Sequence, residues 1–397
     1  MGTPDRGVAL PAAINNRPEL ALLLTIARVD LDPSRQTAMQ DLLAGPLDWE
    51  CLLSMAVQHG LEPLLFLHLH RIAPQFAPQE FMQALRADCK TIAARNLILA
   101  SRLKSVSAHL RSRKIEHIAY KGPLLAETYF GNCALRVSYD LDILVQPSQF
   151  EAARDALGEI GFSDKNGLSA GQQAMSFRFG FEHSFTAPGG VDLDLHWRVV
   201  QKFKSSSLDM EGVWQRATSA HAWGCEMPTL CPEDLLVALC LHAGHHGWMQ
   251  LSHLCDIAQL FQVHLQLDWD IVRRHLGDSN TTRIVYVSLH LLEKYWQANI
   301  PGDLKAAILA DPNVARLARR IQSEIWPSSR PALTTSSLRW LWDRSSGVDL
   351  ADRLRLLTGT FFCPAIEDVE MFRLPRILAT LYPGLRALRL AFKYSLS

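Results

Sequence analysis

The chain has 397 residues, of which 48% are hydrophobic and 20% charged, and its formal net charge is zero because 40 basic residues balance 40 acidic ones. This length exceeds one average domain, and the composition is that of an ordinary globular protein. The balanced charge argues against a general nucleic-acid-binding protein, which usually carries a basic excess. No run of 18 apolar residues occurs, so we expect no membrane-spanning helix.

The N-terminal residues and the cysteines indicate the cellular compartment. Residues 1–18 hold no apolar stretch after a basic segment, so we expect no secretory signal. The eight cysteines are scattered and include no C-x-x-C pair. We therefore expect a reduced protein of the cytoplasm.

Helical spacing dominates the first part of the chain. Apolar residues between positions 81 and 110 recur at roughly the spacing of one helix face. We therefore predict an N-terminal helical region over residues 1–112, with helices from about residue 18 onwards.

The spacing changes to that of strands after residue 112. Ile115–Tyr120 is short and apolar and is followed by Gly122, which predicts a buried strand. Pro123 is a favoured first helical residue and predicts a helix over Leu124–Tyr129. A second strand is predicted over Tyr139–Val145, where polar and apolar residues alternate.

A helix and a hairpin follow. Ser148–Ile160 has helical spacing, with Ser148 as the expected N-cap and Gly161 closing the helix. Ser176–Thr186 and Val191–Val200 flank the turn Pro188-Gly189-Gly190, which is typical of a β-hairpin. We predict that residues 113–205 form a small α/β core with a mixed sheet.

Beyond Lys202 the spacing becomes helical again, which predicts a C-terminal helical region over residues 206–397. The helices that we expect are Pro232–His242, Leu251–Val263, Trp269–Leu276, Thr282–Trp296 and Leu304–Ile321. The last segment, Leu374–Leu396, is apolar with several basic residues. We expect a terminal helix packed on the core rather than one that lies on a membrane surface. The predicted fold class is α+β, with a small mixed-sheet domain embedded between helical regions.

Two acidic residues lie two positions apart on the second predicted strand. Side chains at such positions point from one face, about 7 Å apart along the chain, so Asp140 and Asp142 share a face. The intervening Leu141 and Ile143 point into a core. Two ionised carboxylates on one face repel each other unless a cation lies between them. Mg²⁺, or Mn²⁺ in its place, is the natural cation because it binds carboxylate and phosphate oxygens.

The second strand of the predicted hairpin carries a similar row of polar residues. Asp192, Asp194 and His196 alternate on one face, and either acid could be the third carboxylate of a metal site. An isolated Asp-x-Asp is common by chance, and acids at a sheet edge are often only solvated. Two copies on strands of one small block favour a metal site.

Lys121 and Gly122 lie between the first predicted strand and the helix that follows it. A helix N-terminus has exposed N–H groups that favour a phosphate, and glycine allows the phosphate to approach the backbone closely. Lys121 adds a positive charge there. Lys-Gly-Pro alone is a weak signal, since most such triplets are simple turns.

Other polar residues near these positions have more than one interpretation. Arg136 and Ser138 either contribute to phosphate binding or orient Asp140, or they are an arginine paired with a nearby acid and a serine that caps a backbone N–H. His242 and His246 are four residues apart at a helix end. A structural or substrate-contacting role is favoured over a shared metal, because no glutamate lies between them as in H-E-x-x-H.

The sequence resembles the uncharacterised bacterial nucleotidyltransferase family of the DNA polymerase β-like superfamily. The resemblance covers roughly residues 90 to 265, and its motifs are Lys121-Gly122, Tyr129, Arg136, Asp140-x-Asp142, Leu144-Val145, Asp194-Leu195-His196-Trp197, Pro232-Glu233-Asp234-Leu235-Leu236 and Leu241-His242.

The resemblance implies a mixed sheet, a glycine turn at the phosphates and three metal-binding acids. It implies that the third acid is Asp194, since the family's acid directly precedes Leu-His-Trp, with Asp192 as the alternative. His196, His242 and His246 are then candidates for contact with the substrate. The wider superfamily usually has Gly-Ser at the turn, whereas Pro123 follows Gly122 here, so a phosphate-binding hydroxyl is missing.

The function that the resemblance implies is metal-dependent transfer of a nucleoside monophosphate from a nucleoside triphosphate to a hydroxyl acceptor. Asp194 is the candidate base, and the acceptor is a small molecule, a peptide or protein, or an RNA end. Transfer of a phosphoryl or another group at the same site is an alternative. A non-catalytic nucleotide-binding protein is a third possibility, which the missing hydroxyl favours and the three acids disfavour.

Overall fold

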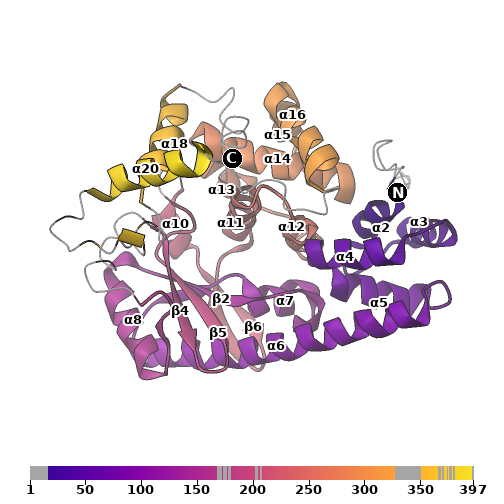
Figure 1. Ribbon diagram of the computed structural model, residues 1–397, viewed down its shortest axis with the longest axis horizontal. Helices are drawn as coiled ribbons and strands as arrows, with labels where there is room; N and C mark the ends of the chain where they lie inside the picture. The colour runs from indigo at the N-terminus through magenta and orange to yellow at the C-terminus, as the bar shows by residue number, and fades with distance from the viewer. Residues whose placement is uncertain are drawn as a thin grey trace.

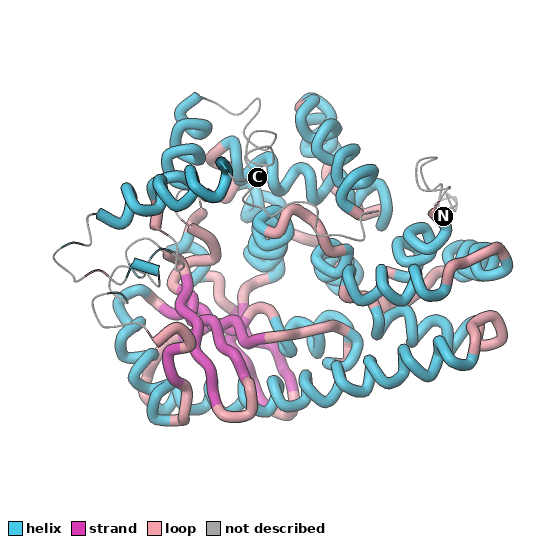
Figure 2. The backbone as a smooth tube through the Cα atoms, viewed as in Figure 1, coloured by secondary structure: helices cyan, strands magenta, loops and turns pink. Residues whose placement is uncertain are grey.

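The computed structural model describes residues 17–167, 180–201, 204–205, 208–326, 350–364 and 381–395, with residues 172, 177, 368, 371–372, 374 and 378 between them. Helices pack around a five-stranded mixed sheet and a separate two-stranded hairpin, and Figure 2 shows the helices and strands. The fold is therefore α+β, and the predicted class is confirmed.

Five helices make up the N-terminal part of the described chain: α2 (Pro18–Ile26), α3 (Pro33–Ala44), α4 (Trp49–His59), α5 (Glu62–Ile72) and α6 (Gln79–Ser112). The side chains of Asp32 and Asp48 cap α3 and α4 by accepting hydrogen bonds from backbone N–H groups. The prediction of helices from about residue 18 onwards is confirmed. Leu99 and Leu103, in the second half of α6, pack against the sheet.

Five strands form the sheet in the order β1–β2–β5–β4–β3. Their bounds are His117–Ala119 (β1), Asp140–Val145 (β2), Ser163–Asp164 (β3), Glu182–Ala187 (β4) and Val191–His196 (β5). β2 and β5 are parallel, and all other neighbours are antiparallel. The predicted hairpin is confirmed as β4–β5. Ser176, where its first strand was expected to begin, lies outside the described residues.

The two central strands, β2 and β5, have one apolar face. Leu141 and Ile143 of β2 are fully buried, as are Leu193 and Leu195 of β5, and they pack with residues of α6 and of α8 (Phe150–Glu159). Figure 1 shows α6 along one side of the sheet and the helices α11 (Pro232–His245) and α12 (Leu251–Val263) on the other. The second face of β2 and β5 is therefore turned toward α11 and α12.

The other helices are α7 (Gly122–Phe130), α10 (Met210–Gln215), α13 (Trp269–Arg274), α14 (Ser279–Trp296), α15 (Gly302–Ala310), α16 (Pro312–Arg320), α18 (Leu350–Phe362) and α20 (Tyr382–Ser395), with short helical turns at Cys133–Leu135, Pro147–Gln149 and Ile321–Ile325. One large core joins N-terminal residues such as Leu22 and Leu65 to C-terminal ones such as Leu239 and Leu289.

Two helix predictions are wrong in detail. The single helix expected over 304–321 is broken between α15 and α16, because Pro312 has no backbone N–H to continue the helix and Asp311 caps the new one. Ser148 does not cap α8, since it lies within a 3₁₀ turn and α8 begins at Phe150 without a side-chain cap. Gly161 does follow the end of α8, with φ of +89°.

A second hairpin lies where helix was expected after residue 202. β6 (Thr218–Ala222) and β7 (Cys225–Thr229) pair antiparallel. Trp223 and Gly224 form the turn with φ of 50° and 77°. Two consecutive residues with positive φ are typical of the type I′ turns that close two-residue hairpins.

The C-terminal helix α20 lies against α18 (Figure 1). Tyr382 and Leu390 are buried, while Leu388 and Phe392 are exposed. Packing of this helix against its neighbours agrees with the preferred expectation, although part of the predicted segment lies outside the described residues. Within the described chain, no helix is both long and apolar enough to cross a membrane.

Candidate active site

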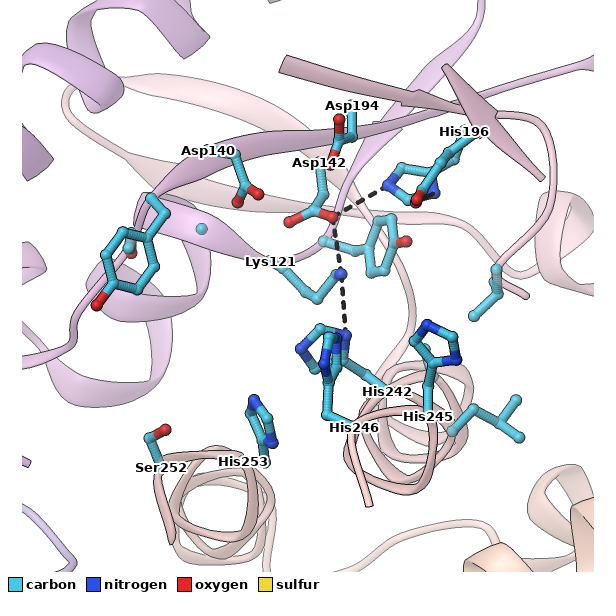
Figure 3. Close-up of a pocket in the computed structure, with 18 of the residues that line it drawn as sticks. Lys121, Asp140, Asp142, Asp194, His196, His242, His245, His246, Ser252 and His253 are labelled. Atoms are coloured by element: carbon cyan, nitrogen blue, oxygen red, sulfur yellow. Dashed lines mark hydrogen bonds and ion pairs between the residues drawn. The ribbon is translucent and has the colours of Figure 1, made fainter. Parts of the chain in front are cut away.

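A cavity of about 340 Å³ lies between the polar face of the sheet and helices α11 and α12 (Figure 3). Its lining includes all of the candidate residues of the sequence analysis except Asp192: Lys121, Gly122, Arg136, Ser138, Asp140, Asp142, Asp194, His196, His242 and His246. Residues more than 100 positions apart in the sequence thus share one concave surface.

The three acids lie on the two central parallel strands. Asp142 of β2 is the register partner of Asp194 of β5, and Asp140 precedes Asp142 on the same face. Asp192, the alternative third acid, is the register partner of Asp140, but its carboxylate lies 2.5 Å from Nζ of the half-exposed Lys165. Asp192 is not part of the lining of this cavity, whereas Asp194 is.

Asp142 is the centre of a buried polar network. Its Oδ1 lies 2.7 Å from Lys121 Nζ and 3.0 Å from His196 Nε2. Burial alone would raise the pKa of Asp142, but the Lys121 ammonium and the hydrogen bond from His196 hold it well below its usual range. Burial likewise opposes the charge on Lys121, yet Asp142 raises the pKa of this lysine. Both groups are therefore ionised.

Asp140 and Asp194 differ from Asp142 in their partners. Across the residues that the structure describes, neither carboxylate accepts a hydrogen bond or forms an ion pair. Burial raises the pKa of Asp140 to about 6, and the negative charges of Asp142 and Asp194 add to this effect. A cation at this position would relieve the repulsion between the acids.

The glycine turn is required by both its conformation and its surroundings. Gly122 has φ of +61°, and a Cβ atom there would lie 2.9 Å from the backbone oxygen of Asp140. A side chain at this position would therefore be strained and would push against the strand that carries the acids. Gly122 is the first residue of α7, and no side chain caps this helix. The turn thus brings an uncapped helix N-terminus beside Asp140.

Arg136 forms a bidentate ion pair with Asp256 of α12. Nε and a terminal nitrogen lie 2.7 and 2.8 Å from the two carboxylate oxygens. The other terminal nitrogen donates to the backbone oxygen of Val137 and to Oγ of Ser138. Arg136 is thus paired with an acid, as one interpretation expected, but it is mostly buried. Ser138 accepts from this arginine, and its hydroxyl caps no backbone N–H in the described chain.

Four histidines form the wall opposite the acids (Figure 3). His242, His245 and His246 come from the end of α11, and His253 comes from α12. The His242 ring centroid lies 4.6 Å from that of His246 and 4.9 Å from that of His253. Burial lowers the pKa of His246 to about 4, and nearby Lys121 adds to this effect. Burial also places the pKa values of His242 and His253 well below the usual range. His242, His246 and His253 are therefore neutral.

Glu182 and His253 of the site have no counterpart among the sequence predictions. Glu182 of β4 is the register partner of His196, and burial raises its pKa to about 7. His253 completes the histidine wall. A signal for Glu182 exists in the sequence: counting outward from the turn at Pro188-Gly189-Gly190 places residue 182 opposite 196.

Comparison with known proteins identifies the family of the chain. Residues 45–297 match the family described as uncharacterised nucleotidyltransferase, and the chain belongs to that family. No curated protein matches the chain. Among solved structures, an antigenic nucleotidyltransferase-like protein from Paracoccidioides brasiliensis is similar at 15% sequence identity and a TM-score of 0.32, with 54% of this chain and 92% of that chain covered.

Proposed function

We propose that this protein transfers a nucleoside monophosphate from a nucleoside triphosphate to a hydroxyl acceptor in a metal-dependent reaction. The observation that carries the proposal is the placement of Asp140, Asp142 and Asp194 on adjacent parallel strands, beside the glycine turn that starts α7. Membership in a nucleotidyltransferase family supports the same reaction class.

The three acids fit a divalent metal of the Mg²⁺ or Mn²⁺ type. They supply hard carboxylate oxygens, and Asp140 and Asp194 have oxygens with no other partner in the described chain. Such an ion, when bound, neutralises charge on the phosphates and on the leaving group. The uncapped N-terminus of α7 and the Lys121 ammonium supply further positive potential for the triphosphate. Lys121 in this role offsets the missing hydroxyl at Pro123.

The chemical step forms one bond and breaks another. The acceptor oxygen attacks the α-phosphorus, the bond from this phosphorus to the bridging oxygen breaks, and pyrophosphate leaves. The acceptor proton passes to Asp194, whose carboxylate has no competing partner in the described chain. The histidine wall then faces the acceptor, which is a small molecule, a peptide or protein, or an RNA end.

One observation favours non-catalytic nucleotide binding as a second candidate. The Lys121 ammonium is bound to Asp142, which is a position that a metal would need. If Lys121 keeps this position when a nucleotide binds, the protein binds a triphosphate without turning it over.

Labelled triphosphates distinguish these functions. The full-length protein is incubated with Mg²⁺ and a cell lysate, and each triphosphate carries the label on either its α- or its γ-phosphorus. Nucleotidyl transfer moves the α-label to an acceptor and releases pyrophosphate, whereas phosphoryl transfer moves the γ-label. The matched controls are Asp140→Asn, which should be inactive, and Asp192→Asn, which should be active. Binding of a triphosphate with transfer of neither label would support the non-catalytic function.

A further inference from the structure

Glu182, Asp194 and His196 converge at the edge of the cavity that lies away from Asp140. Each offers one oxygen or nitrogen atom, and these three atoms lie within 4.8 Å of one another. Glu182 and His196 face each other across the β4–β5 pairing, and Asp194 shares a strand face with His196. The hairpin therefore fixes the relative positions of all three side chains.

The two ring nitrogens of His196 have different environments. Nε2 is hydrogen-bonded to Asp142 at 3.0 Å. Nδ1 is buried, takes part in no hydrogen bond with any described residue, and lies 3.3 Å from Glu182 Oε2. The side chain as a whole is 2% exposed. A buried imidazole with one nitrogen hydrogen-bonded to a carboxylate and the other close to an acidic side chain is the usual arrangement of a metal-binding histidine, because the first carboxylate fixes the orientation of the ring.

We propose that Glu182, Asp194 and His196 form a second divalent-cation site, which takes an imidazole-binding ion of the Mn²⁺, Co²⁺ or Zn²⁺ class in preference to Mg²⁺. The site shares Asp194 with the proposed Mg²⁺ site of Asp140 and Asp142. Ion binding here requires neither a nucleotide nor a transfer reaction. This inference therefore holds or fails separately from the proposed function.

The ligand set explains the choice of ion. Mg²⁺ binds oxygen ligands and keeps much of its water, whereas Mn²⁺, Co²⁺ and Zn²⁺ also accept imidazole nitrogen. Three protein ligands leave at least one position open, as in sites where a metal contacts a substrate. His196 thus distinguishes this site from the all-carboxylate one.

The local charge also favours a cation. The carboxylates of Asp140, Asp142, Asp194 and Glu182 line one cavity, and the ammonium of Lys121 contacts only Asp142 among them. The guanidinium of Arg136 is held by Asp256 and adds little net charge. The carboxylates of Asp140 and Asp194 therefore have no cationic partner in the described chain, and a divalent ion would relieve their repulsion.

Cobalt binding tests the proposal directly. The full-length protein is stripped of metal with a chelator and titrated with Co²⁺ in excess Mg²⁺ without nucleotide, and the visible absorption of protein-bound Co²⁺ is recorded. We expect one Co²⁺ per chain and at least tenfold weaker binding in Glu182→Gln and in His196→Gln, because each loses a direct ligand. Asp140→Asn should bind Co²⁺ normally, and Asp192→Asn is the control on the same strand.

Several results would overturn the proposal. One is the absence of a Co²⁺ band in excess Mg²⁺, in which case Glu182 and His196 form an ion pair only. Another is an equal loss of Co²⁺ affinity in Asp140→Asn and Glu182→Gln, which would place the ion among the three aspartates. Because His196 is buried, the Co²⁺ affinity of its variant is interpreted only if thermal unfolding is cooperative, which shows that the variant is folded. Glu182 is partly exposed, and its variant keeps the test valid if the histidine variant does not fold.

Discussion

Lys121 Nζ lies 2.7 Å from Oδ1 of Asp142, so the lysine of the glycine turn is paired with one of the acids predicted to hold a metal. Both side chains are nearly buried, at 11% and 7% exposure. The same ammonium lies 3.4 Å from Nδ1 of His242 on the opposite wall. This lysine therefore supplies positive charge at an acid where a metal and its nucleotide would also bring positive charge.

The two acids of β2 should therefore differ in their contribution to stability. Asp140→Asn removes a carboxylate that repels its neighbours, so the melting temperature without metal should hold or rise slightly. Asp142→Asn leaves Lys121 buried without its counter-ion and should cost about 3 kcal/mol of unfolding free energy. Urea unfolding of both variants checks this, and equal stability of the two would contradict the pairing.

Both variants should nevertheless lose transfer activity. Each removes a carboxylate from the proposed metal site, and a loss of about a thousandfold or more is expected in each. Release of pyrophosphate with lysate as the source of acceptor is the measurement. Full activity in either variant would show that the acid is not a metal ligand.

Replacing Lys121 should have opposite effects on the binding of metal and on the binding of nucleotide. In Lys121→Met the ammonium no longer competes for Asp142, so Mn²⁺ should bind more tightly without nucleotide. A non-hydrolysable triphosphate should bind more weakly, because a positive charge beside the α7 N-terminus is lost. Calorimetry measures both affinities, and Lys165→Met is the control, since its ion pair with Asp192 lies outside the cavity. Unchanged affinities in Lys121→Met would exclude a role for this lysine.

One pair of variants tests whether Asp194 or Asp192 is the third carboxylate of the proposed metal site. Asp194 lines the cavity, whereas Asp192 contacts Lys165, so Asp194→Asn should lose transfer by orders of magnitude and Asp192→Asn should be nearly normal. Single-turnover release of pyrophosphate separates them. The reverse result would mean that Asp192, two residues earlier on the same face of β5, is the third acid.

Strand periodicity explains why much of the site can be predicted from the sequence. Alternation fixes which side chains share a face, so Asp140 with Asp142, and Asp194 with His196, follow from local pattern alone. The parallel pairing of β2 with β5 is not a local property. The resemblance to a family, rather than any spacing, placed the two rows together.

The residues that were not predicted depend on long-range contacts or on the strand register that follows from the β4–β5 turn. Glu182 follows from counting pairs outward from the β4–β5 turn. His253 does not, because its place beside His242 depends on how α12 packs against α11. The ion pair of Arg136 with Asp256 spans 120 residues and likewise has no local signal.

Acid should destabilise the protein through buried neutral histidines, of which His59 is the clearest test. Its Nε2 lies 3.2 Å from the backbone oxygen of Trp326, and its Nδ1 accepts from the backbone N–H of Leu251. Burial lowers the pKa of His59 to about 4. As the pH falls below about 6.5, the unfolded chain binds a proton that the folded chain does not. The unfolding free energy therefore falls between pH 6.5 and about 4, by up to about 1.4 kcal/mol per pH unit for this histidine.

The comparison of wild type with His59→Gln isolates this contribution. Glu62 has the opposite effect, because burial raises its pKa to about 7, but it is present in both proteins and cancels in the difference. The variant should be less stable than the wild type at pH 7.5, because it loses part of the hydrogen bonding of His59. The difference in unfolding free energy between the two proteins should be smaller at pH 6.5 and 5.5. The wild type loses stability as His59 of the unfolded chain binds a proton, whereas glutamine does not titrate. Urea unfolding at the three pH values gives the difference. A difference that stays constant from pH 7.5 to 5.5 would mean that the pKa of His59 is the same in the folded and the unfolded chain.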